Sequence, residues 1–282
     1  MSTVPNPGFR IRVDVTNPGQ FFACCGLLEL VERIAPGAES CFEGSHLCVS
    51  SSVSLRSVLD ALHSIKLANG ETRDFPEGDN SDTESKSEND EAGSGDAPIE
   101  ISAPVSLRLD WWKEKGLKTW AGSMQPRAIF LAMCGAVDPD AVDPLNQRTV
   151  VYDPVLEQTG IGSRKKKRDK REPFYFDARR SPSSSDLDIG FSTNRLKMET
   201  LAYPAVEALC FIGLQRWRPS IAGKKLTYHV WHRQLPAILS AAACSGGFPD
   251  VTVPFEFLMH YRTKYMKAFL SAKPKKLQPI IK

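Results

Sequence analysis

The chain of 282 residues has no long apolar run. No stretch approaches the roughly eighteen consecutive apolar residues that cross a bilayer, and the opening residues, MSTVPNPGFRIRVDV, do not have the pattern of a signal peptide. Hydrophobic residues make up 41% of the chain and charged residues 24%, which is typical of a globular protein with a sizeable core. We therefore expect a cytoplasmic protein with no membrane partner.

The seven cysteines include an adjacent pair, Cys24-Cys25, but no CxxC motif. This odd number and spacing indicate neither a disulfide framework nor a zinc ribbon. Cys24, Cys25 and Cys210 lie in apolar stretches with helical spacing, where a free thiol packs as a small hydrophobic side chain. The sequence thus favours a reducing compartment, and it predicts no metal site and no other cofactor.

The signatures of common catalytic sites are also missing: there is no P-loop, no GxGxxG after a strand, no GxSxG and no HExxH. His229 and His232 lie three residues apart on a predicted strand, so they point to opposite faces and do not form a metal pair. A ribonuclease could use His229 or His260 as general base beside Tyr228 or Lys264, although no spacing favours this. We therefore predict no enzyme and no small-molecule substrate, with a metal-independent endoribonuclease as the alternative.

Acidic residues are concentrated in one segment, 71–100. Eleven Asp or Glu stand there against Arg73 and Lys86, a balance of −9, so the rest of the chain carries +12 although the net charge is only +3. A segment this charged buries too little apolar surface to offset its conformational entropy, and it is predicted to be disordered. The predicted organisation is an N-terminal α/β part at 1–70, the acidic insert at 71–100, and a C-terminal α/β part at 101–282 that shares one core with the first.

Hydrophobic periodicity predicts both strands and helices in the two α/β parts. Strands expected next to one another along the chain favour an α+β fold, with mixed or antiparallel sheets packed against about five helices. The expected strands are 9–15, 105–111, 173–180, 186–192, 226–233 and 251–265. The expected helices are 20–35, 54–67, 126–136, 205–217 and 236–247.

The first and fourth of these helices share a pattern. PGQFFACCGLLEL and YPAVEALCFIGLQR both place a proline before an apolar helix whose middle contains Cys and then Gly-Leu. Chance similarity and internal duplication both remain open. Gly26, in the first helix, lowers helix stability by about 1 kcal/mol relative to alanine, so its presence there predicts close backbone packing. Leu28 is predicted to belong to the core face.

One candidate nucleic-acid-binding segment is the run RKKKRDKR at 164–171. A loop with this charge can follow a phosphate backbone, although a solvated hairpin loop or a nuclear import signal would have the same composition. The basic residues of this run are Arg164, Lys165, Lys166, Lys167, Arg168, Lys170 and Arg171.

The C-terminal residues 257–282 form a second candidate, with seven Lys or Arg, no acidic residue and several interleaved aromatic residues. Cationic groups beside exposed rings suit single-stranded nucleic acid, because phosphates pair with the charges and bases stack on the rings. The predicted binding residues here are Tyr261, Arg262, Lys264, Tyr265 and Lys267, and Arg179 and Arg180 extend the set. A third candidate surface, for nucleic acid or for a partner subunit, consists of Trp111, Trp112 and Trp120 with Lys113, Lys115 and Lys118.

Three segments together resemble a known family. They are VTNPGQFFACCGLLEL, then PFYFDARR followed by DLDIGFSTN, and YPAVEALCFIGLQRWRP, which cover about 16–30, 173–194 and 203–219. The first resembles the start of subunits encoded in type I-U (I-G) CRISPR operons and, more loosely, the start of Cascade large subunits. The set is most similar to the third of the Csb-type proteins. The acidic insert is not a feature of that family.

The resemblance implies a non-catalytic subunit of an RNA-guided surveillance complex in antiviral defence. Its partners would be guide RNA, target DNA or both, together with other subunits of the effector complex. No residue role is carried over from the family, so the site residues rest on charge and aromatic pattern. A purely structural interaction protein is the further alternative.

Replacing Lys165, Lys166 and Lys167 with alanine tests the basic run. If all three lysines contact phosphates, nucleic-acid binding by the assembled complex should weaken, and the salt dependence of log K should flatten by about two units, since each contact contributes roughly 0.7 to 0.9. The measurement is a binding titration at several salt concentrations. Binding equal to wild type at every concentration would contradict contact through this run.

Overall fold

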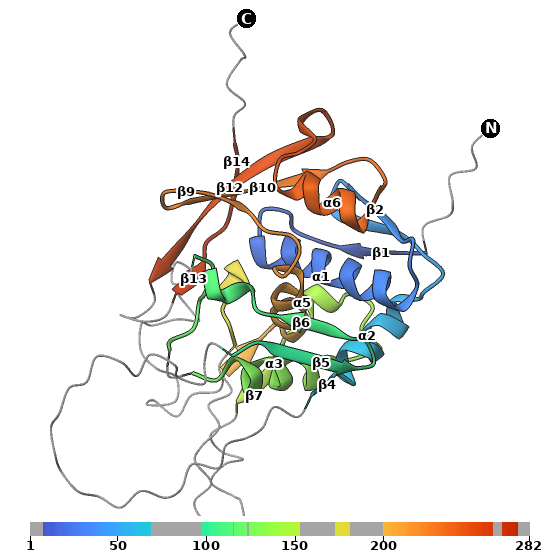
Figure 1. The fold of residues 1–282 in the computed structure, drawn as a ribbon, viewed down its shortest axis with the longest axis vertical. Helices are drawn as coiled ribbons and strands as arrows, with labels where there is room; N and C mark the ends of the chain where they lie inside the picture. The colour runs from blue at the N-terminus through green and yellow to red at the C-terminus, as the bar shows by residue number, and fades with distance from the viewer. Residues whose placement is uncertain are drawn as a thin grey trace, which may run out of the picture.

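The computed structural model describes residues 8–68, 97–114, 116–122, 124–152, 173–180, 200–261 and 267–275. Within these ranges, five α-helices pack with several antiparallel sheets, which confirms the predicted α+β fold (Figure 1). No helix in the described ranges has the length and apolar character needed to span a membrane.

The five described helices correspond to the predicted ones. They are α1 (Pro18–Ile34), α2 (Leu55–His63), α3 (Pro126–Gly135), α5 (Pro204–Gly213) and α6 (Ala237–Cys244). A proline begins α1, α3 and α5, and its fixed φ and missing N–H suit the first helical position. The predicted helix at 54–67 is too long, because α2 ends at His63 and the next residues join a sheet.

The two larger sheets consist mainly of strands from the N-terminal and the C-terminal part of the sequence, respectively. One has the order β1-β3-β2-β11, and the other has the order β13-β12-β10-β9 with β14 paired to β12. Their strands are β1 (Phe9–Arg12), β2 (Glu39–Glu43), β3 (His46–Ser50), β9 (Ser220–Ala222), β10 (Lys225–Trp231), β11 (Leu235–Pro236), β12 (Thr252–Tyr261), β13 (Lys267–Phe269) and β14 (Lys273–Pro274). Two smaller sheets consist of β4 (Lys66–Leu67), β5 (Ile99–Ala103) and β6 (Leu107–Leu109), and of β7 (Thr149–Tyr152) and β8 (Thr200–Ala202).

Several predicted strand boundaries are wrong. The segment 173–180 is not a strand: residues 173–176 are irregular and a short 3-10 helix, η3, spans Ala178–Arg180. Residues 71–96 of the predicted insert lie outside the described residues. Its last two residues, Ile99 and Glu100, belong to β5. The hairpin of β2 and β3 was not predicted, and the predicted strand at 186–192 lies outside the described residues.

Helices α1 and α5 cross at two glycines, Gly26 and Gly213. A Cβ added to Gly26 would overlap the carbonyl oxygen of Leu209, and one added to Gly213 would overlap the carbonyl oxygen of Phe22. Leu209 lies four residues before Gly213 in α5, and Phe22 lies four residues before Gly26 in α1. The two helices therefore make the same contact in both directions. The close backbone packing predicted from Gly26 is confirmed.

A single hydrophobic cluster contains residues from both α/β parts, including the fully buried Leu28. Trp111, Trp112 and Trp120 also belong to it, with exposed fractions of 2%, 1% and 3%. Trp112 stacks on Phe211 of α5 at 5.2 Å between ring centroids. The predicted surface built on these tryptophans is therefore wrong, because the three rings lie in the core.

Gly26→Ala tests the helix crossing. The added methyl group meets backbone that cannot rotate away, so the substitution should lower the free energy of unfolding by at least about 1–3 kcal/mol. The matched control is Gly135→Ala at the end of α3, where a Cβ meets nothing within 4 Å. That control should be neutral or stabilising by about 0.4–1 kcal/mol. Urea denaturation measures both, and equal stability of the two variants would contradict the crossing.

Candidate functional site

The predicted nucleic-acid-binding residues are only partly described. Residues 164–171 and residues 262–266 lie outside the described ranges, so Arg164 to Arg171, Arg262, Lys264 and Tyr265 have no structural account. Arg180 ends η3, and only its backbone is described. The side chains of Arg179, Tyr261 and Lys267 are described, and they occupy two separate places.

Tyr261 and Lys267 face each other at the end of the C-terminal sheet. They are directly paired where β12 meets β13, and the Lys267 ammonium lies 5.2 Å from the centre of the Tyr261 ring. The Tyr261 side chain is 60% exposed, whereas Phe257 and Phe269 on the same strands are buried. This pair presents an accessible ring and a positive charge together, which is the combination that stacks a base and contacts its phosphate.

Further along the same sheet, exposed lysines continue the positive charge. Lys273 and Lys275 are exposed on and next to β14, which pairs with β12. Lys225 of β10 is different, because its ammonium forms an ion pair with Glu256 at 2.8 Å. Arg216 and Arg218 form ion pairs with Glu29 and Glu114.

Arg179 is held by protein groups on all sides. Its guanidinium binds both carboxylate oxygens of Asp177, with Nη2–Oδ2 at 2.6 Å, and donates to Asn146 Oδ1 and to the carbonyl oxygen of Leu145. It also stacks on Tyr203, with the guanidinium carbon 3.4 Å from the ring centre. The geometry gives Arg179 a structural role, since most of its donors are already used.

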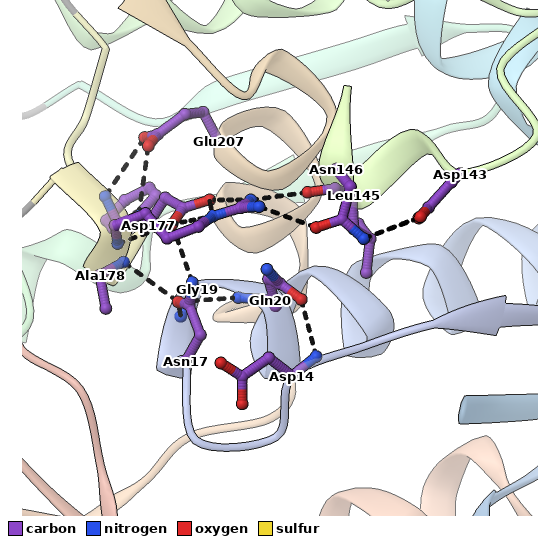
Figure 2. Close-up of polar contacts among 12 residues, drawn as sticks. Asp14, Asn17, Gly19, Gln20, Asp143, Leu145, Asn146, Asp177, Ala178 and Glu207 are labelled. Carbon is purple, nitrogen blue, oxygen red and sulfur yellow. Dashed lines mark hydrogen bonds and ion pairs between the residues drawn. The ribbon is translucent and has the colours of Figure 1, made fainter. Parts of the chain in front are cut away.

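Asp177 is fully buried and connects this arginine to the start of α1. Asn17, the N-cap of α1, accepts hydrogen bonds at Oδ1 from the backbone N–H groups of Gly19 and Ala178, and donates from Nδ2 to Asp177 Oδ1 (Figure 2). The buried carboxylate of Glu207 in α5 accepts from the backbone N–H of Asp177. We call Asn17, Asp177, Arg179 and Glu207 the Asn17 junction.

The three segments that carry the family resemblance meet at this junction and at the glycine crossing. Asn17 and Gly26 come from the first segment, Asp177 from the second, and Glu207 and Gly213 from the third. Comparison of the chain with protein-family models, with curated proteins and with solved structures found no match. The described contacts of these segments hold distant parts of the fold together.

A polar pocket of about 550 Å³ lies beside the Asn17 junction. It is bounded by the end of β1, the turn between β2 and β3, the start of α1 and the 143–146 segment. Its lining offers two guanidinium groups, two carboxylates and two amides, from Arg12, Arg179, Asp14, Asp143, Gln20 and Asn146. The amide oxygen of the buried Gln20 accepts from the backbone N–H of Asp14. This mixture suits a polar ligand with both donors and acceptors.

Tyr228 and His229 do not converge as the suggested ribonuclease pair, and Lys264, the other suggested partner of a histidine, lies outside the described residues. Tyr228 is buried on the core side of β10, where its hydroxyl donates to the carbonyl oxygen of Val15 at 2.6 Å and burial raises its pKa. His229 points to the opposite face, and burial together with the nearby Lys275 lowers its pKa. All seven thiols are buried, and this burial raises their pKa values, so thiolate nucleophiles are disfavoured.

Asn17→Ala tests the junction. The substitution removes the N-cap of α1 and leaves the buried N–H of Ala178 and the Asp177 carboxylate without their partner, so it should cost about 2–4 kcal/mol of unfolding free energy. The control is Ser54→Ala, which removes the N-cap of α2, where Ser54 Oγ accepts only from the neighbouring N–H of Ser57 and contacts its hydroxyl. That change should cost about 0.5–2 kcal/mol. Equal losses of stability in thermal denaturation would show that the contacts of Asn17 with Asp177 and Ala178 contribute nothing to the stability of the fold.

Proposed function

We propose that this chain is a non-catalytic subunit of a type I-U or I-G CRISPR effector complex in the cytoplasm, where it binds guide RNA or target DNA and contacts sister subunits. The resemblance of three segments supports membership of the family. The charge pattern supports nucleic acid as the ligand, since the chain outside the acidic segment carries +12.

The observation that carries the proposal is the exposed pair of Tyr261 and Lys267. An isolated tyrosine on a sheet is unremarkable, but this ring is 60% exposed, has a lysine ammonium against it and belongs to a C-terminal segment with no acidic residue. A base stacked on the ring would place its phosphate near Lys267. The same surface would have little reason to be basic in a purely structural subunit.

The experiment compares variants of the chain in the complex assembled by co-expression with its operon neighbours. Tyr261→Ala should weaken binding by about 1–3 kcal/mol for each stacked base and leave the salt dependence unchanged. Lys267→Ala should instead reduce the slope of log K against log salt by roughly 0.7 to 0.9. The control is Lys66→Ala, an exposed lysine on β4, in a different sheet; it should bind as wild type does.

Circular dichroism and gel filtration must show that each variant is folded and assembled. Wild-type binding by both Tyr261→Ala and Lys267→Ala would contradict the proposed contact and favour a structural partner. Cleavage of guide-RNA precursor by the wild-type complex, abolished in His260→Ala, would instead favour the endoribonuclease.

A further inference from the structure

A cluster of ligand-type side chains lies on one face of the β2–β3 hairpin, apart from both the Asn17 junction and the Tyr261–Lys267 pair. Cys41 of β2 is directly paired with Cys48 of β3, and paired residues of antiparallel strands have their side chains on the same face. Glu43 follows Cys41 by two residues, which returns it to that face. Phe42 and Leu47 lie on the other face, and both faces contribute to the core: Cys41 and Cys48 are themselves buried, at 3% and 2% exposed, whereas Glu43 is exposed.

The distances in this cluster are close to those of a coordination sphere. The two sulfur atoms and a carboxylate oxygen of Glu43 all lie within 4.8 Å of one another, and Cys41 Sγ is 3.8 Å from Glu43 Oε1. Ligands of a tetrahedral zinc ion, with Zn–S near 2.3 Å and Zn–O near 2.0–2.2 Å, are separated by about 3.5–3.8 Å. Closing the cluster around an ion therefore needs side-chain shifts of about 1 Å or less.

The register that creates the cluster is fixed by a tight turn. Glu43 and His46 are the last paired residues, so only Gly44 and Ser45 connect the strands. Gly44 has φ of +57°, a conformation that two-residue hairpin turns need and that glycine adopts without strain. A two-residue turn allows one register, and this register places Cys41 opposite Cys48.

Arg10 of β1 orients the carboxylate. Its guanidinium lies 3.3 Å from Glu43 Oε2, while the other oxygen, Oε1, faces the thiol of Cys41. Outer partners that fix one oxygen of a ligating carboxylate are a regular part of metal sites. Two thiolates and one carboxylate would carry three negative charges, which a divalent ion and the Arg10 guanidinium would neutralise.

We propose that Cys41, Glu43 and Cys48 bind one divalent zinc ion on this face of the hairpin. Two thiolates select a soft or borderline ion such as Zn²⁺ over Mg²⁺ or Ca²⁺. Solvent or His46, which is paired with Glu43 on the same face, completes the tetrahedron. The ion fastens β2 to β3. This site departs from the sequence-based prediction of no metal, because a Cys pair separated by six residues becomes a ligand pair only once the strands are paired.

The test titrates the full-length, reduced and chelator-treated chain with Cd²⁺, which substitutes for Zn²⁺ and gives an ultraviolet thiolate-to-metal charge-transfer band. Wild type should bind one ion per chain with this band. Cys41→Ala and Cys48→Ala should each weaken binding by at least about 100-fold, because loss of an outer-shell partner alone costs 10–100-fold. Cys134→Ala, which removes a buried thiol of α3, is the matched control and should bind as wild type does.

A second measurement uses wild type only, so it stands even if the cysteine variants do not fold. The X-ray absorption spectrum of the chain loaded with one Zn²⁺ should show two sulfur neighbours at about 2.3 Å. The melting temperature should rise with Zn²⁺, since an ion that binds only the folded chain stabilises it. A spectrum with only nitrogen and oxygen neighbours, or a charge-transfer band unchanged by both Cys41→Ala and Cys48→Ala, would overturn the proposal.

Discussion

The backbone contact between α1 and α5 is the constraint on which the rest of the structure depends. Gly26 and Gly213 let the two helices approach until the carbonyl oxygens of Leu209 and Phe22 lie where side chains would otherwise be. Because one helix is near the start of the chain and the other is beyond residue 200, this approach joins the two α/β parts into one core. Side chains such as Trp112 and Phe211 then pack around a fixed helix pair.

The Asn17 junction fixes the 173–180 segment against this helix pair. A buried carboxylate is costly unless its oxygens receive hydrogen bonds or an ion pair, and Asp177 receives both, from Asn17 and from Arg179. The side chain that caps α1 therefore also fixes the 173–180 segment, and Glu207 fixes it from the side of α5. Segments from three distant parts of the chain thus meet at this junction.

Groups available to partners lie away from this centre. The ring of Tyr261 and the ammonium of Lys267 are at the edge of the C-terminal sheet, and Cys41, Glu43 and Cys48 share one face of another sheet, where Glu43 is exposed and the two thiols are buried. Arg179, Arg216 and Arg218 look equally basic in the sequence, but acidic partners neutralise them in the fold. These three arginines are therefore less available to a ligand than the sequence suggests.

The sequence by itself determined the fold class, the five helices and the close packing at Gly26, because periodicity, proline at helix starts and a costly mid-helix glycine are local signals. It did not reveal the β2–β3 hairpin or the burial of Trp111, Trp112 and Trp120, since both depend on partners distant in the chain. Charge pattern put Tyr261 and Lys267 in one predicted set with Arg179, whose partners Asp177 and Asn146 are brought together only by folding. Likewise, Cys41 and Cys48 become neighbours through strand pairing, and only the tertiary structure decides which side chains share a site.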